Sequence, residues 1–227
     1  MTAQPSISVR GEATLEVDPE IAVVSVTIMA RDADRHRALE LLAARNAQVM
    51  ALLRAQGDAV EKIESGSVNV HPEFRPAKIG GKIKERIAGY TASGSVSVTV
   101  ADFTVLGDLV AGLASEEMVA VRGPWWSLRP DSGVHRQARL TAARDALRRA
   151  REYAEAFGGR VTGLAEVADA GLLTDAKQPV RMHAMAASGA AYDSAEGQED
   201  LDFEPAKQTV RAQVEARFTM TPPEFEA

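Results

Sequence analysis

Three segments of the chain alternate apolar and polar residues at every second position. They cover residues 7–17, 90–100 and 210–220. Their apolar members are Ile7, Val9, Ala13, Leu15 and Val17; Tyr90, Ala92, Val96, Val98 and Val100; and Val210, Ala212, Val214, Ala216, Phe218 and Met220. Alternate side chains of a strand point to opposite faces, so this pattern predicts strands with one buried and one wet face. Parallel strands are usually buried on both faces, so we expect largely antiparallel sheets.

Apolar residues at helical spacing predict three helices. The first follows Asp34 as its N-cap and ends at Gly57, the second begins after Asp102, and the third follows Ser132 and stops at Gly158. The expected inner stripe of the third helix is Leu140, Ala143, Leu147, Ala150, Ala154 and Phe157. Further strands are expected at 21–30, 62–71, 119–128 and 161–169. The sequence therefore predicts an α+β fold, with largely antiparallel sheets and three helices packed on one side.

Two segments lack a sustained period and are expected to lie outside the core. Residues 72–88 contain two prolines, Gly80-Gly81 and five basic residues, which suits a long hairpin connection. Residues 172–206 combine small residues with an acidic cluster, so we expect a flexible acidic loop there. The cluster consists of Asp193, Glu196, Glu199, Asp200, Asp202 and Glu204.

Length and composition favour one globular unit. With 227 residues, 45% of them apolar, we expect a single domain over 1–227 whose core spans about 7–221. The formal net charge of −6 comes largely from the acidic cluster, and the near-neutral remainder argues against nucleic acid as a partner. The chain contains no cysteine, which excludes disulfides and zinc–thiolate sites. Met1–Pro5 does not resemble a signal peptide and no apolar run reaches the ~20 residues of a membrane span, so we expect a cytoplasmic location.

Catalytic motifs are not evident. No phosphate-binding loop, nucleophile elbow, zincin helix or dinucleotide fingerprint occurs, so we predict no catalytic residue and no cofactor. The best remaining candidates are His71 and Glu73, which are two positions apart and therefore on one face of a strand, where they could hold a metal or transfer protons. Pro72 between them is expected to end the strand. A surface position at a strand end is the alternative reading of both residues.

Trp125 and Trp126 are adjacent and must point to opposite faces of a strand. Only one of the two rings can lie in the main core. The other is expected to be covered by a helix, a loop or another subunit, and tryptophan is enriched in interface hot spots. Both residues are therefore interface candidates.

Several local sequences resemble the SIMPL-domain family. The opening Ile7-Ser8-Val9-Arg10-Gly11-Glu12-Ala13, then Val17-Asp18-Pro19-Glu20-Ile21-Ala22, is similar to the family's start. Gly89-Tyr90 and the helix from Ala138-Arg139 to Gly158 are similar to its later parts, so the resemblance covers roughly residues 7–221. It implies an α+β module, usually exported or envelope-anchored, without an established catalytic site. It also implies a link to oxidative-stress tolerance in some bacteria and to signalling adaptors in animals.

These observations favour a non-enzymatic interaction or scaffold protein, with a stress-related role as the resemblance implies, that forms a homo-oligomer through sheet edges or the extra tryptophan. One alternative is a small-ligand or metal-binding protein, or a hydrolase, with a cleft near residues 71–86. Another is peripheral envelope association through basic residues of the 72–88 segment. These are Arg75, Lys78, Lys82, Lys84 and Arg86.

Overall fold

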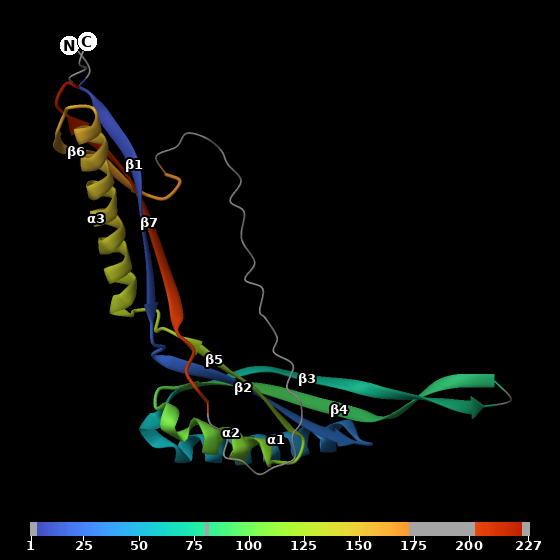
Figure 1. Ribbon diagram of the computed structural model, residues 1–227. Helices are drawn as coiled ribbons and strands as arrows, with labels where there is room; N and C mark the ends of the chain where they lie inside the picture. Colours follow the sequence, from blue (N-terminus) through green and yellow to red (C-terminus); the bar gives the residue numbers. More distant parts are fainter. Residues whose placement is uncertain (1–3, 80–81, 173–202, 224–227) are drawn as a thin grey trace. The chain divides into compact units, whose positions relative to one another are not determined.

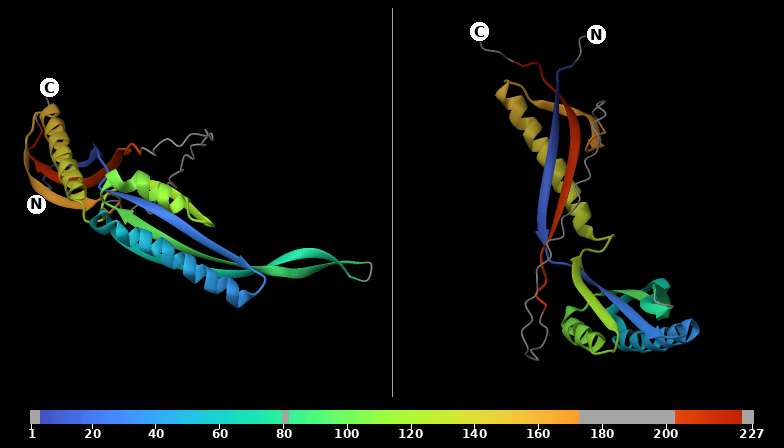
Figure 2. Two further views of the ribbon diagram at one scale, coloured as in Figure 1. Left: turned by 90° about the horizontal axis from the view of Figure 1, so that it is seen from below. Right: turned by 90° about the vertical axis from the view of Figure 1, so that its right-hand side faces the viewer.

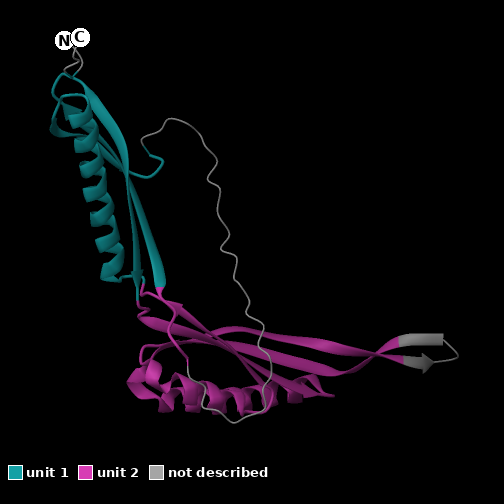
Figure 3. Ribbon diagram, in the orientation of Figure 1, with its two compact units in different colours: residues 1–17, 130–196, 208–227 teal, residues 18–129, 197–207 magenta. Residues whose placement is uncertain are grey.

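The chain forms two compact units, each with its own sheet and core (Figure 3). The computed structural model describes residues 4–79, 82–172 and 203–223, and of residues 77–79 and 82–84 the backbone alone. Unit 1 comprises residues 1–17, 130–196 and 208–227, and unit 2 comprises 18–129 and 197–207.

In chain order the elements are β1 (Ser6–Val17), β2 (Ile21–Asp32), α1 (Arg35–Ala55), η1 (Gly57–Ala59), β3 (Val60–Ile79), β4 (Lys82–Val100), η2 (Phe103–Val105), α2 (Leu106–Ala114), β5 (Val119–Ser127), α3 (Gly133–Ala156), β6 (Val161–Asp169) and β7 (Gln208–Met220) (Figure 1). The predicted α+β fold with antiparallel sheets is confirmed.

Unit 2 is built on a four-stranded antiparallel sheet in the order β3-β4-β2-β5. Helices α1 and α2 cover one face of it, as Figure 2 shows. The alternate residues of β2 and β4 that face the helices are buried, and Leu42 and Leu53 of α1 complete the core with Leu106 and Leu113 of α2. We call the opposite face of this sheet the open face.

Local chemistry explains where α1 begins. The carboxylate of Asp34 accepts hydrogen bonds from the backbone N–H groups of His36 (2.8 Å) and Arg37 (3.0 Å). The bond from Arg37, followed by that from His36, lowers the pKa of Asp34. Asp34 is thus the N-cap that the sequence predicts, and the buried residues of the helix follow at helical spacing.

Unit 1 is built on a three-stranded antiparallel sheet in the order β1-β7-β6, with α3 packed on one face. The buried stripe of α3 consists of Ala138, Ala142, Ala146, Ala150 and Ala154. The predicted stripe is therefore partly wrong, because Leu140, Ala143 and Phe157 are exposed and Leu147 is only partly buried.

Gly11 of β1 gives the physical reason for that difference. A Cβ atom at this position would lie 2.1 Å from the carbonyl oxygen of Ala142 and 2.7 Å from the Cβ of Ala146. The helix axis therefore approaches the strand so closely that only the smallest side chains fit between them.

The segment 72–88 is a strand pair rather than a connecting loop. The β3–β4 ladder continues from Pro72 opposite Tyr90 to Ile79 opposite Lys82. Pro72 thus does not end its strand, contrary to the prediction. Because β3 is an edge strand, a proline that donates no hydrogen bond is tolerated there.

The acidic segment predicted at 172–206 lies mostly outside the described residues, which omit 173–202. Near its end, Phe203 is partly buried and packs against the core of unit 2. Each of the two compact units has a core of its own. That the two units together form a single domain over 1–227 stays a prediction.

Candidate functional site

The structure places the predicted pair His71 and Glu73 on β3 of unit 2. His71 is exposed and lies opposite Thr91 of β4. The carboxylate of Glu73 forms an ion pair with the Nε atom of Arg31 at 3.2 Å and accepts a hydrogen bond from the Thr91 hydroxyl. The carboxylate is therefore held by a cation on β2 and a hydroxyl on β4, both on the open face.

No group of three or more His, Asp or Glu residues within the described part of the chain is arranged to hold a metal ion. A metal or proton-transfer role for His71 and Glu73 stays a prediction. The nearby hollow of about 420 Å³ is lined by neither residue. Its lining includes Arg75 and Arg86, which lie directly opposite each other on β3 and β4.

The two tryptophans lie on β5, the other edge of the unit 2 sheet, and point to opposite faces. Trp126 is paired with Ala22, packs against the core and makes an edge-to-face contact with Phe103, with ring centroids 4.9 Å apart. Trp125 is paired with Val23 on the open face and is 52% exposed. Trp126 thus anchors the strand in its own core, while Trp125 presents its ring to solvent.

The open face around Trp125 consists mainly of small, uncharged side chains. The half-buried residues on it are Val23, Ser25, Thr27 and Met29 of β2, and Thr91, Ser93, Ser95, Ser97 and Thr99 of β4. Charged residues on its β3 side occur in pairs, with Lys62 2.8 Å from Glu64 and Glu73 bound to Arg31. On β5, exposed Arg122 lies opposite Ser25 of this face. The result is a sheet face formed largely of hydroxyls, with one large ring and one arginine on its β5 edge.

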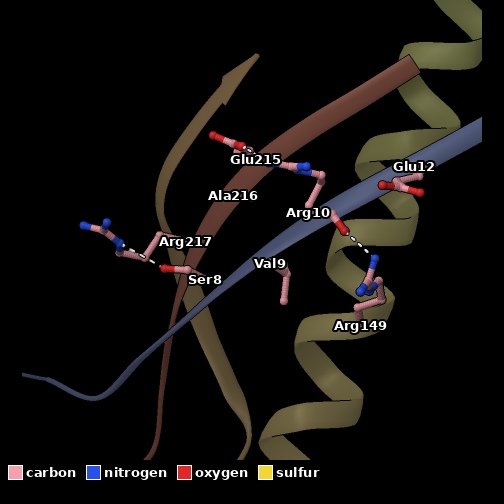
Figure 4. A pocket seen from close by; sticks show the side chains of 8 residues that line it. All are labelled: Ser8, Val9, Arg10, Glu12, Arg149, Glu215, Ala216 and Arg217. Atoms are coloured by element: carbon pink, nitrogen blue, oxygen red, sulfur yellow. Dashed lines mark hydrogen bonds and ion pairs between the residues drawn. The ribbon is translucent and has the colours of Figure 1, made fainter. Parts of the chain in front are cut away.

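A second hollow, of about 470 Å³, lies in unit 1 against β1 and β7 (Figure 4). Arg10 forms an ion pair with Glu215 at 2.8 Å, and the Glu215 side chain is buried. Arg149 of α3 donates to the backbone carbonyl of Arg10 at 2.7 Å, and Arg217 donates to the Ser8 hydroxyl at 3.3 Å. Each of these arginines is thus engaged within the unit.

The polar groups of this hollow are held by an ion pair and hydrogen bonds within unit 1. Its one hydroxyl belongs to Ser8, and the lining contains no histidine that would activate it as a nucleophile. The sequence indicates that Arg10 and Glu215 lie on the wet faces of two strands. It does not place them opposite each other, because the pairing of β1 with β7 joins residues 205 positions apart.

Arg148 of α3 is also held by neighbouring groups on its own helix. Arg148 pairs with Asp145 and with Glu152, the latter at 2.7 Å, and these bonds raise the pKa of Arg148, the Asp145 hydrogen bond most strongly. Asp145 also accepts a hydrogen bond from the backbone N–H of Glu12 at 3.1 Å. Ion pairs between residues three and four positions apart on one helix are typical of a solvated helix face.

These features define an α+β protein with two antiparallel sheets, helices on one face of each, and an exposed tryptophan on the open face of one. The chain belongs to the SIMPL family, described as proteins of unknown function (DUF541), whose model matches residues 7–218 and so spans both units. The family resemblance found in the sequence is confirmed.

A similar protein is the uncharacterized protein YggE of Edwardsiella ictaluri (strain 93-146). It is 24% identical over 154 residues, which cover 68% of this chain and 63% of the relative. The chain therefore spans less than two thirds of that relative's length. Among the helices that the structure describes, none combines the length and apolar composition needed to cross a membrane.

Proposed function

We propose that this protein is a non-enzymatic interaction protein that self-associates through the open face of unit 2, with Trp125 as the central contact. The observation that carries the proposal is the exposure of Trp125, at 52%, on a strand whose backbone is fixed by pairing with β2. A large ring held in one position loses little conformational entropy on binding and buries much apolar area. Exposed tryptophans in such positions are common binding hot spots.

The composition of the open face favours a second copy of the chain as the partner. The chain has a formal net charge of −6, so two copies repel each other over much of their surface. On the open face the central side chains are hydroxyls, and the charges of Arg31, Glu73, Lys62 and Glu64 compensate one another. Arg122 of β5, opposite Ser25, adds one exposed cation to this face. Two identical faces of this kind can pack as stacked sheets, provided that the twofold axis keeps the two copies of Arg122 apart. As the family resemblance implies, we associate this assembly with stress tolerance.

The test is the mass of the protein in solution, measured by light scattering and sedimentation over a range of concentrations. We expect the wild-type mass to exceed the monomer mass of 24.2 kDa. The Trp125→Ser variant should associate about thirtyfold more weakly or worse, since truncation of a hot spot commonly costs about 2 kcal/mol or more. Leu41→Ser, at an exposed apolar position on α1 of the same unit, is the matched control and should behave as wild type.

Two results would contradict this proposal. A wild-type protein that remains monomeric at all concentrations would exclude self-association. A wild-type oligomer that Trp125→Ser leaves unchanged would exclude the open face as its contact.

A further inference from the structure

Strand β6 forms one edge of the unit 1 sheet and leaves apolar side chains uncovered. On its inner side it pairs with β7, and in the described part of the chain no strand pairs with its outer side. Leu164 and Val167 lie opposite Phe218 and Ala216, so they share the sheet face on which α3 packs. Yet both are 57% exposed, because the core under α3 is formed mainly with β1 and β7.

A register shift between Leu164 and Glu166 explains how the two residues come to share one face. Three positions apart in a regular strand, they would point to opposite faces. The bulge at Ala165 adds one residue to β6, so that Leu164 and Val167 point to the same face of the sheet. The two apolar side chains therefore lie together at the sheet edge.

The other sheet edges are protected by recognisable means. At β1, the backbone N–H of Glu12 donates a hydrogen bond to Asp145 of α3. The backbone carbonyl of Arg10 accepts one from Arg149 of the same helix. Strand β3 carries Pro72 and Pro76, and β5 carries Pro124 beside a register shift. Prolines and covering groups prevent a second chain from pairing with an edge. Strand β6 contains no proline, and its exposed pair is apolar.

We propose that β6 pairs antiparallel with β6 of a second copy about a twofold axis, so that the two unit 1 sheets join edge to edge. This inference rests on the proposed self-association and adds a second contact, separate from Trp125. In the register that we propose, Leu164 of each copy lies opposite Val167 of the other, and Thr162 lies opposite Asp169. The apolar pair is then formed twice by one symmetry operation.

The charges on β6 favour this register over its neighbour. A shift of one residue that centres the axis on Glu166 would place two carboxylates directly opposite each other, which is destabilising. In the proposed register Glu166 lies opposite Ala165 of the second copy. The charge on Glu166 thus favours the proposed alignment over the one centred on Glu166.

The contact is small, since β6 has nine residues. Interfaces well below about 1,200 Å² are typical of weak, transient association. We therefore expect the β6 contact to depend strongly on concentration and to need a test that traps it.

The absence of cysteine from the sequence makes disulfide trapping a clean test. Three single variants are prepared: Leu164→Cys, Val167→Cys and, as a control at an exposed apolar position on α3, Leu140→Cys. A disulfide needs Cβ atoms about 3.5–4.5 Å apart, and within an antiparallel pair only residues directly opposite each other come close to this separation. Mild oxidation of a mixture of the first two variants should therefore give covalent dimers about tenfold faster than either variant alone or any mixture with the control.

The outcomes separate this inference from the proposed function. Trapping specific to the mixture supports the β6 contact, including when Trp125→Ser has abolished the larger assembly. A wild type that self-associates while the mixture forms dimers only at the rate of the Leu140→Cys control would overturn the β6 contact and leave the proposed function standing. A wild type that is monomeric, with no specific trapping, would overturn both.

Discussion

At the scale of single residues, carboxylates connect the elements of this protein. Asp145 is the clearest case, because its side chain joins α3 to β1 through the N–H of Glu12 and joins Arg148 on its own helix. The hydrogen bond from Glu12, followed by that from Arg148, lowers the pKa of Asp145. The folded state therefore favours the ionised carboxylate.

This shift predicts how stability depends on pH. A carboxylate with a depressed pKa stabilises the folded state above its unfolded pKa of about 4, and that contribution is lost as the pH falls through the lower, folded value. Asp145→Asn retains a hydrogen-bond acceptor but removes the charge, so we expect it to cost about 1 kcal/mol at neutral pH. The cost should disappear in acid, where the wild-type carboxyl is also neutral.

Urea unfolding of both proteins at a series of pH values measures this difference. Glu155→Gln removes an exposed carboxylate from the same helix and serves as the control. A deficit of Asp145→Asn that is the same at pH 7 and in acid would show that the charge contributes nothing.

At the scale of elements, the buried face of α3 consists of alanines rather than of large side chains. Alanines at every fourth position from Ala138 to Ala154 form the contact with the sheet, and Gly11 of β1 lies against Ala142 and Ala146. Leucines on the same helix are exposed or only partly buried. Packing in this unit therefore depends on close approach of backbones rather than on large side chains.

A pair of identical substitutions tests this arrangement. Ala146→Leu adds atoms where none fit, so we expect a loss of about 1–3 kcal/mol, the usual cost of overpacking, or failure to fold. Ala143→Leu makes the same change at an exposed position and should change stability by less than about 0.5 kcal/mol. Denaturant unfolding followed by circular dichroism gives both values, and equal effects would contradict the observed stripe.

At the scale of the whole molecule, two cores form within one chain. The chain leaves unit 1 after β1, forms most of unit 2 from residues 18–129, and returns to unit 1 for α3, β6 and β7. Both ends of the described chain thus belong to the same unit. Hydrogen exchange can distinguish two separately opening units from one cooperative domain.

Gly11→Ala provides the perturbation for that experiment, because its Cβ would meet the backbone of α3 at 2.1 Å. We expect amide exchange followed by mass spectrometry to accelerate in α3 and β7 of unit 1 and to stay unchanged in α1 and β2 of unit 2. Gly112→Ala on α2 has no atom within 4 Å of the new Cβ and should accelerate exchange in neither unit. Equal acceleration in both units would instead support the single domain that the sequence predicts.

The sequence by itself determined the local structure and the family. Strand alternation and the caps Asp34 and Ser132 depend on neighbouring residues, so they can be read directly along the chain. The position of Trp125 and Trp126 on opposite faces follows from the same alternation, although only the structure shows that Trp126 is the ring held in the core.

Tertiary structure alone decided what depends on partners distant in sequence. Leu140 and Leu147 make the more apolar stripe of α3, but close approach to Gly11 selects the alanine stripe. The prolines of β3 are tolerated because that strand has a neighbour on one side only, which no local pattern records. The same reason applies to Arg10 with Glu215 and to the uncovered β6 edge: which strand lies beside which is set by the packing of the whole unit, not by the residues adjacent in the chain.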